Sequence, residues 1–374
     1  MTTYPQPEPA QFTAGSSRPK VAVVRTRPET VLEDVSRVMR LAGYQQILPL
    51  DIPILLKINI SWQHWYPACS TTPWQLEGVI RTLQTDGYSD LIPAQNGTVV
   101  VDSFVGEERN KHKPVLEKFG LHSLHLDVPP TPWVPYQPKG KMLVLDKIFP
   151  EGITIPDCYP GKSIIQLPTM KTHVFTTITG AMKNAFGGLL NRKRHWTHSV
   201  IHETLVDLLT IQKEIHPGLF AVMDGTFAGD GPGPRAMRWH TPNFLLASAD
   251  QVAIDAISAK LMGFDPLEIQ FIRLAHERGL GCGDPREIEL VGDEITGVDL
   301  GFEAMGNTFA SRGQRLIYWG PLKPLERVLL RSPLVSLAYL ASNLYHNGYW
   351  FNLIGKRRAR QALQTDWGKL FLEY

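Results

Sequence analysis

The chain has 374 residues, of which 43% are hydrophobic and 20% charged, so it can bury a large core and has an ordinary globular composition. Its formal net charge of +2 gives no overall field favouring nucleic acid, which is therefore excluded as a predicted partner. Cys69, Cys158 and Cys282 are too few and too far apart for a disulfide framework, and they suit a reducing compartment, so the predicted location is the cytoplasm.

The two ends of the chain differ from its middle. Residues 1–20 are rich in Pro, Thr and Ser and lack the apolar stretch of a secretory signal, so they are predicted to be a flexible tail. Residues 316–374 are rich in leucine and aromatic residues and contain a basic stretch at 356–360, which predicts a helical extension. This extension either packs on the rest of the protein or makes a peripheral membrane contact, because no apolar run reaches the roughly 18 residues of a membrane span.

Between these ends, short apolar runs alternate with segments of helical periodicity. The predicted strands are residues 21–24, 52–60, 98–101, 163–167, 220–223, 244–247 and 288–291. The predicted helices are residues 31–42, 75–83, 110–118, 204–215, 249–261 and 266–278, and residues 124–160 are expected to be irregular. This alternation predicts an α/β domain over residues 21–315 with a largely parallel sheet flanked by helices.

Ligands of open α/β sheets bind beyond the carboxyl ends of the strands, and polar residues follow several of the predicted strands. Lys57 and Asn59 lie on one face of the strand at 52–60, and the turn that follows contains Thr72 as a predicted N-cap. A lysine within an apolar run needs a partner. Lys57 therefore either binds an anion or extends to solvent or to Asp51.

The densest polar cluster follows the strand at 163–167 and contains two lysines and a histidine. Its candidate ligand-binding or catalytic residues are Lys171, His173, Thr179, Gly180, Lys183 and Asn184. The Thr-Gly-Ala-x-Lys-Asn sequence is typical of a turn that cradles a phosphate, although the spacing of a P-loop is absent. The alternative is a polar loop capped by glycines.

Two further groups are candidates for chemistry. On a helix, His195, His198 and His202 share one face, a spacing that suits a divalent metal, although histidines at an exposed helix start are more often solvated. The strand at 220–223 brings Asp224 to its carboxyl end as a general base or ligand, and the glycine-rich stretch with Asp230 and Gly231 follows. That stretch is alternatively a rigid surface turn.

A string of short motifs in fixed order resembles the family called domain of unknown function 362, over roughly residues 50–280. The motifs are Lys57-x-Asn59, Thr71-Thr72-Pro73, Leu167-Pro168-x-Met170-Lys171-Thr172-His173, Thr179-Gly180-Ala181-x-Lys183-Asn184-x-Phe186-Gly187, Asp224-Gly225, Asp230-Gly231-Pro232 and Ala249-Asp250-x-Val252-Ala253-x-Asp255-Ala256. The resemblance implies no established reaction. Many relatives carry cysteine clusters for iron–sulfur centres, which normally need four thiolates, so a self-contained cluster is not expected from three scattered cysteines.

Three functions follow from the sequence. The first is an enzyme that binds a small anionic metabolite through Lys57, Lys171 and Lys183, with His173 and Asp224 moving protons. The second, which rests on the resemblance, is a redox protein served by a separate ferredoxin or flavoprotein as electron carrier. The third is a non-catalytic binding or membrane-surface scaffold that uses residues 316–374.

Overall fold

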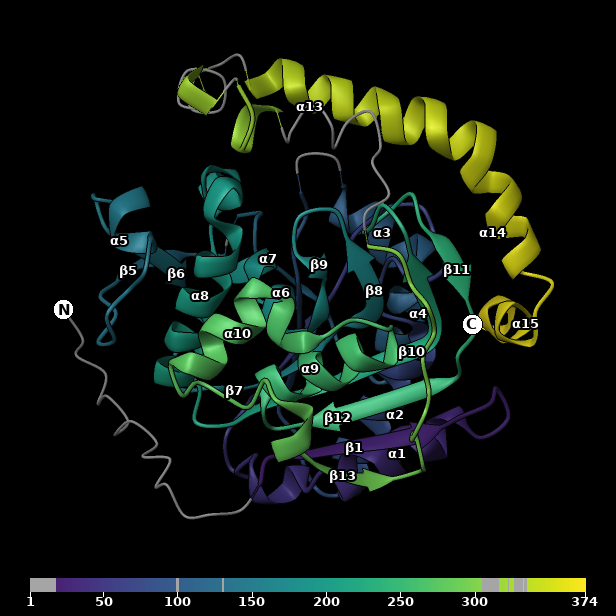
Figure 1. The fold of residues 1–374 in the computed structure, drawn as a ribbon. Coiled ribbons are helices and arrows are strands. Elements are labelled where there is room, and N and C mark those ends of the chain that lie inside the picture. The colour runs from purple at the N-terminus through teal and green to yellow at the C-terminus, as the bar shows by residue number, and fades with distance from the viewer. Residues whose placement is uncertain are drawn as a thin grey trace.

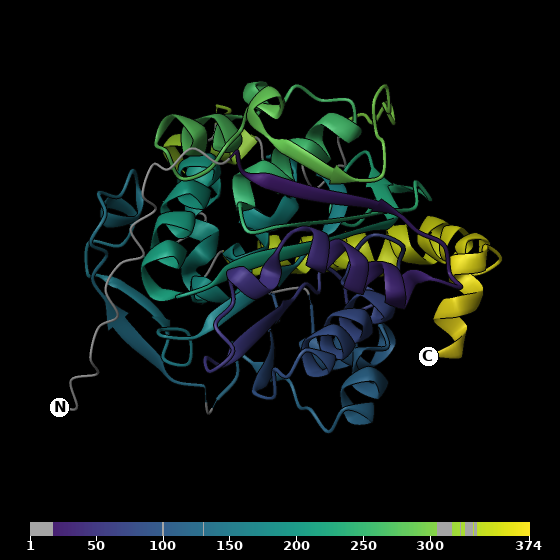
Figure 2. The same cartoon turned by 90° about the horizontal axis from the view of Figure 1, so that it is seen from below.

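A computed structural model describes residues 18–98, 101–129, 131–304, 316–321, 323–325, 332 and 335–374. Of the predicted tail, only residues 18–20 lie within this range, and Lys20 already begins the first strand. The structure is an α/β fold in which helices cover both faces of a central sheet and a helical run crosses one edge (Figure 1, Figure 2).

The central sheet is mostly parallel, as predicted. Its main path has the order β13-β1-β12-β10-β7-β2-β3-β4, and β12 is antiparallel to both of its neighbours while the other pairs are parallel. The strands of this path are β1 (Lys20–Arg25), β2 (Ile54–Ile58), β3 (Leu91–Gln95), β4 (Leu124–His125), β7 (Ser163–Leu167), β10 (Leu219–Asp230), β12 (Phe244–Ser248) and β13 (Glu289–Gly292). Off the path lie β8 (Thr169–His173), β9 (Thr177–Ile178) and β11 (Arg238–His240), while β5 (Trp133–Tyr136) and β6 (Ile153–Pro156) form a separate pair.

Alternation along the strands divides the core into two hydrophobic clusters, one on each face of the sheet. In β1, Val21 and Val23 belong to one cluster, and Ala22 and Val24 to the other. The first cluster is covered by α5 (Leu145–Ile148), α6 (Gly180–Asn184), α7 (Phe186–Leu189), α8 (Ile201–Ile215), α9 (Gln251–Leu261) and α10 (Gln270–Glu277). The second is covered by α1 (Val31–Leu41), α2 (Pro73–Thr85) and α4 (His112–Lys118), with α3 (Ser103–Arg109) packed on α4.

The strand β10 extends the sheet beyond the end of β7 and thereby positions the candidate site. Its first residues pair with β7, and its later residues pair with β8, which begins directly after Pro168. Pro168 has no N–H for a ladder hydrogen bond, so the chain bends there and continues as a second strand beside the same partner. Residues 169–173 therefore lie beyond the carboxyl end of the sheet in a fixed conformation.

The structure differs from the sequence predictions for this region. Residues 99 and 100 of the strand expected at 98–101 lie outside the described residues, and Thr98 and Val101 form an isolated antiparallel bridge with each other. The strand β3 lies earlier, at Leu91–Gln95, where Pro93 conceals it from sequence patterns. Proline is tolerated at position 93 because β4 pairs only with Ala94 and Gln95. At Pro93 the outer side of β3 has no partner strand, so β3 is an edge strand there. The alternative of a polar loop after Leu167 does not hold, because β8 and β9 form there. Residues 124–160, expected to be irregular, contain β4, β5, α5 and β6.

The C-terminal extension is helical, as predicted, and one of its faces packs on the α/β body. It contains α13 (Val335–Asn343), a π-helical segment η6 (Leu344–Gly355), α14 (Lys356–Ala362) and α15 (Asp366–Glu373). Its inner side chains join the second hydrophobic cluster, and they are Trp350, Ala359, Ala362, Trp367 and Phe371. Among the described residues, no helix combines the length and apolar character that a bilayer span requires.

Candidate functional site

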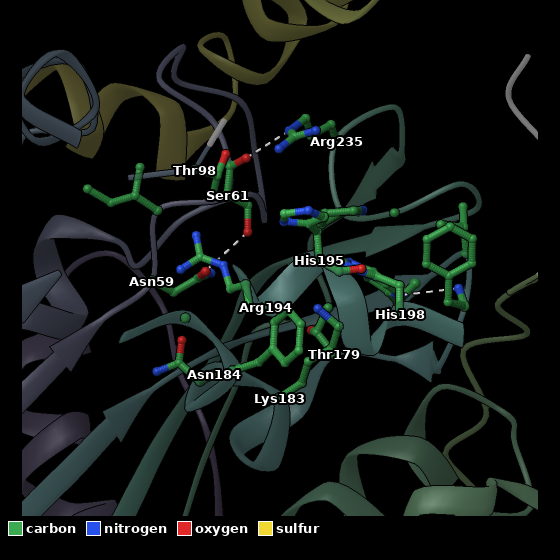
Figure 3. Close-up of a pocket in the computed structure, with 18 of the residues that line it drawn as sticks. Asn59, Ser61, Thr98, Thr179, Lys183, Asn184, Arg194, His195, His198 and Arg235 are labelled. Atoms are coloured by element: carbon green, nitrogen blue, oxygen red, sulfur yellow. Dashed lines mark hydrogen bonds between the residues drawn. The ribbon is translucent and has the colours of Figure 1, made fainter. Parts of the chain in front are cut away.

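A cavity of about 800 Å³ lies beyond the carboxyl ends of the parallel strands β2, β3, β4 and β7 (Figure 3). Its walls come from the segments after these strands, from β8, and from residues 179–198 and 232–235, while residues of the C-terminal extension cover it. The structure thus brings most of the predicted site residues to one cavity, namely Lys57, Asn59, Lys171, His173, Thr179, Gly180, Lys183, Asn184, His195 and His198.

Positive charge dominates this cavity. Six cationic side chains line it, and they are Lys57, Lys171, Lys183, Lys193, Arg194 and Arg235. Among the described lining residues, Asp127 carries the one carboxylate. Charge of one sign in a partly buried space raises the local concentration of counter-ions, so the cavity has the electrostatic character of an anion site.

Lys57 is held inside the sheet by the strand β2. The side chain is 2% exposed, and its Nζ donates a hydrogen bond of 2.7 Å to the carbonyl oxygen of Ile58. Burial, with a further contribution from the nearby Arg194, lowers the pKa of Lys57 to about 7. Asp51 is exposed and forms no ion pair with it in the described part of the chain, so the alternative of an Asp51 partner does not hold.

Lys171 and Lys183 differ in their partners. The Nζ atom of Lys171 donates to the carbonyl oxygen of Cys69 at 2.9 Å and to Oγ1 of Thr169 at 2.6 Å. Lys183 lies 5.6 Å from the centre of the Phe186 ring, and no described residue accepts a hydrogen bond from its Nζ. Burial lowers the pKa of Lys171 to about 7 and that of Lys183 to about 8, with Arg194 and Arg235 lowering the latter further. Lys183 is therefore the cation best placed to bind a ligand.

Two arginines complete the site, and sequence reasoning missed both. Arg194 donates to the carbonyl oxygen of Gly97 at 2.7 Å, and Arg235 donates to that of Ser61 at 2.8 Å. Arg194 belongs to a basic run, residues 192–194, whose sequence is typical of a solvated helix end. Arg235 directly follows the glycine- and proline-rich segment after β10, and its position after a strand was the signal that could have identified it.

His173 lines the cavity as a neutral imidazole. Its Nδ1 accepts a hydrogen bond of 3.2 Å from the backbone N–H of Phe175, which leaves the proton on Nε2. Burial, together with Lys183, lowers the pKa of His173 well below its ordinary value. A neutral histidine of this kind can donate a hydrogen bond to an anionic or carbonyl oxygen.

The three histidines expected to share a helix face are not brought into one site. Residues 192–200 form a 3-10 helix (η2, Arg192–Val200) with three residues per turn, and α8 begins only at Ile201. His195 and His198 line the cavity, whereas His202 lies in an adjoining depression and stacks on Phe271. In the described ranges, three potential metal ligands come within 4.8 Å of one another at a different place, formed by His276, Cys282 and Glu287.

The Thr179-Gly180-Ala181 turn binds a carboxylate of the protein itself. Asp255 of α9 accepts hydrogen bonds from the backbone N–H groups of Ala181 at 2.5 Å and Met182 at 3.0 Å. Burial raises the pKa of Asp255 to about 8. These donors are therefore not available to a phosphate, and the turn instead fixes the short helix α6 that carries Lys183 and Asn184. Asn184 in turn donates to the carbonyl oxygen of Lys57 at 3.0 Å.

Asp224 does not line the cavity. Its carboxylate is fully buried behind β8, where it accepts hydrogen bonds from the hydroxyl of Thr72, from Nε1 of Trp74 at 3.1 Å and from the N–H of Thr226 at 2.6 Å. Thr72 caps α2, as the sequence predicted, by accepting from the N–H of Gln75. These contacts give Asp224 and Thr72 a structural role, joining α2 to β10.

We expect Asp224→Ala to lower the free energy of unfolding by about 3 kcal/mol, because three buried donors lose their acceptor. Urea denaturation measures this effect, and Thr72→Val, which removes one of the donors together with the side-chain cap of α2, provides a comparison. The affinity of the cavity for an anion such as sulfate, used as a probe of its positive charge, should be the same as in the wild type. A stable Asp224→Ala protein that has lost sulfate binding would instead place Asp224 in the binding machinery.

Asp230 and Gly231 also lie outside the lining. Asp230 accepts from the N–H of Glu303 at 2.7 Å and from Nε of Arg238 at 2.9 Å. The carbonyl oxygen of Gly231 accepts from the hydroxyl of Thr172 at 2.8 Å. Both residues thus fix the loop that leads to Arg235 rather than contacting the cavity. Asn59 does line it, and its Nδ2 donates to the carbonyl oxygen of Cys69 at 3.1 Å.

Residues of the C-terminal extension cover the cavity with tyrosine, histidine, aliphatic and serine side chains. These residues are Ile317, Tyr318, Val335, Tyr339, Ser342 and His346. The ring of Tyr318 stacks on that of His198 with 5.7 Å between centres, and Tyr339 meets His195 edge-on at 5.8 Å. The cavity therefore combines cationic walls with a partly apolar cover from a segment that the sequence had not linked to the site.

Comparisons with known proteins identify one relative and one family. A thylakoid-associated protein of Synechocystis sp. is 30% identical over 124 residues, which are 31% of this chain and 37% of that relative. The chain thus spans just over a third of the length of this relative. No solved structure matches the chain significantly. The family described as "Domain of unknown function (DUF362)" matches residues 54–260. This range contains the cavity's lysines, the Gly180 turn and Asp255, and the chain therefore belongs to the DUF362 family.

Proposed function

We propose that the protein is an enzyme that acts on a small organic anion bound in this cavity. The observation that carries the proposal is the set of six cationic side chains facing one carboxylate around a space of about 800 Å³. Such a space accommodates a metabolite, and its partly apolar cover suits an organic body rather than a bare inorganic ion. We assign the activity to the cytoplasm, because Cys69, Cys158 and Cys282 are all free thiols and a reducing compartment maintains them so.

In this proposal the main side chains of the cavity have distinct roles. Lys183, without a hydrogen-bond acceptor of its own among the described residues, binds the anionic group between Arg194 and Arg235. Lys171, with a pKa near 7, exchanges a proton with the ligand at neutral pH, since a general acid or base works best when its pKa matches the pH. His173 donates a hydrogen bond through Nε2 to an oxygen of the ligand.

The proposal is tested first by binding. Sulfate, pyrophosphate and citrate are titrated into the full chain, and the Tm and the heat of binding are measured for each. We expect at least one of these anions to raise the Tm in a saturable manner. A ligand at about 100 times its Kd stabilises the folded state by about 2.7 kcal/mol, so the shift is readily measured.

Single replacements then locate the binding and any turnover that is detected. The variants are Lys171→Met, His173→Gln and Lys183→Met, and the control is Lys260→Met, whose exposed side chain lies at the end of α9. The proposal is rejected if no anion stabilises the wild type, or if the three cavity variants bind as well as the control.

A further inference from the structure

The outer face of the C-terminal helical run exposes a stripe of apolar side chains. Leu340, Leu344 and Leu353 are 56%, 62% and 64% exposed, and Tyr349 lies between them at 56%. These residues are spaced four or five apart along α13 and the π-helical segment η6, so they follow one side of the run. In the described part of the chain, most large apolar residues that are exposed lie between Leu316 and Ile354.

The opposite face of the same run is already occupied. Trp350 and Ala359 are buried, and Trp62 donates to the side chain of Asn347 at 2.6 Å. Nη1 of Arg358 donates to the carbonyl oxygen of Met237 at 2.9 Å, and the cavity-lining Tyr339 and His346 also belong to this inner side. Contact with the body therefore does not explain why the outer face is apolar.

The charge beside this stripe indicates what covers it. Lys356, Arg357 and Arg360 are exposed directly after Leu353, and residues 335–365 contain no aspartate or glutamate. An apolar stripe continued by basic residues, with a tyrosine between leucines, is the pattern of a helix that lies in the interface of an anionic membrane. A protein partner with a neutral or basic surface would not match this charge.

We propose that the outer face of residues 340–360 binds the surface of an anionic lipid bilayer. In that position Leu340, Leu344 and Leu353 enter the acyl boundary, and Lys356, Arg357 and Arg360 meet the lipid phosphates. The run crosses the top of the molecule in Figure 1 and covers the cavity with its inner face, so the cavity lies directly below the membrane surface. This inference does not depend on what the cavity binds.

Flotation of the full chain with vesicles tests the proposal. Vesicles of phosphatidylcholine are compared with vesicles that also contain phosphatidylglycerol, and we expect binding mainly to the second kind, weakened by salt. The variant Leu340→Ser/Leu344→Ser/Leu353→Ser should bind at least about tenfold more weakly. The variant Lys356→Gln/Arg357→Gln/Arg360→Gln should lose the preference for anionic vesicles.

A matched control separates this face from a general loss of apolar surface. Leu50, Leu290 and Leu372 are 60%, 46% and 61% exposed elsewhere on the molecule, and their triple replacement by serine should leave flotation unchanged. Circular dichroism and Tm of every variant establish that it is folded. Equal flotation of the two leucine variants overturns the proposal, as does a wild type that does not float. A concentration-dependent dimer that the Leu340, Leu344 and Leu353 variant abolishes would show a second copy as the occupant instead.

Discussion

Lys183→Met should weaken anion binding strongly and, at the same time, raise the Tm of the ligand-free protein. The ammonium group of Lys183 has no hydrogen-bond acceptor in the described part of the chain, and its burial beside Arg194 and Arg235 is unfavourable until an anion arrives. Removing one charge-assisted hydrogen bond weakens binding by about 10- to 100-fold. Removing a half-buried cation from among like charges should raise the Tm by about 2–4 °C, as is common when a strained binding site is simplified.

The pH dependence of binding gives an independent check. The anion binds the protonated lysines, and burial lowers the pKa of Lys57 and Lys171 to about 7 and that of Lys183 to about 8. Sulfate keeps its charge between about pH 6 and pH 9, so its affinity should be highest near pH 6 and fall as the pH rises through this range. Calorimetry in buffers of different ionisation enthalpy should show proton uptake on binding near pH 8.

Stability follows the opposite trend in the ligand-free protein. The unfolded chain binds protons on these lysines more tightly than the folded chain does, since their folded pKa values are lowered from 10.5. The lysines lower the free energy of unfolding by the full amount below about pH 7, where they are protonated in both states. This destabilisation diminishes as the pH rises from there toward 10.5. Lys183→Met should show a smaller gain in Tm with pH than Lys260→Met. Equal pH profiles and equal sulfate affinities for the two variants would contradict the role assigned to Lys183.

The main features of this fold could be predicted from sequence because they depend on local patterns. The apolar runs at β1, β2 and β7 and the periodicity of α1, α8 and α9 identify a mostly parallel sheet with flanking helices. A parallel sheet in turn places residues that follow its strands at one edge, which is why Lys57, Lys171 and Lys183 were expected to converge. This property of parallel sheets is sufficient to explain why the three lysines line one cavity.

The remaining features depend on contacts between distant parts of the chain. Arg194 lies in a basic run whose sequence is typical of a solvated helix end. The 3-10 helix after α7 turns its side chain toward the carbonyl oxygen of Gly97. Asp224 lies within a strand just as Lys57 does, but the pairing of β8 with β10 encloses it with Trp74. No local pattern indicates that Tyr339 and His346 cover a cavity whose walls are formed by residues more than a hundred positions earlier in the chain.

Gly180→Ala should strongly destabilise the turn that carries Lys183. Gly180 has a φ of +76°, and a Cβ atom there would lie 2.3 Å from the carboxyl group of Asp255. Relief of this overlap breaks the hydrogen bonds from Ala181 and Met182 to Asp255, which fix the helix carrying Lys183. We expect the free energy of unfolding to fall by about 3 kcal/mol and sulfate affinity to fall with it.

Gly161 provides the matched control, because its φ is +77° and no atom lies within 4 Å of the position that a Cβ would take. Gly161→Ala should therefore cost only the strain of the left-handed backbone, about 1 kcal/mol, and leave sulfate affinity unchanged. The double variant Gly180→Ala/Asp255→Ala separates overlap from backbone strain. If the overlap with Asp255 dominates, the double variant loses less stability than the sum of its single changes, because each change removes the same pair of hydrogen bonds. Strict additivity of the two changes, or equal stability losses for Gly180→Ala and Gly161→Ala, would mean that Asp255 does not hold this turn. The hydrogen bonds to Asp255 would then not explain the position of Lys183.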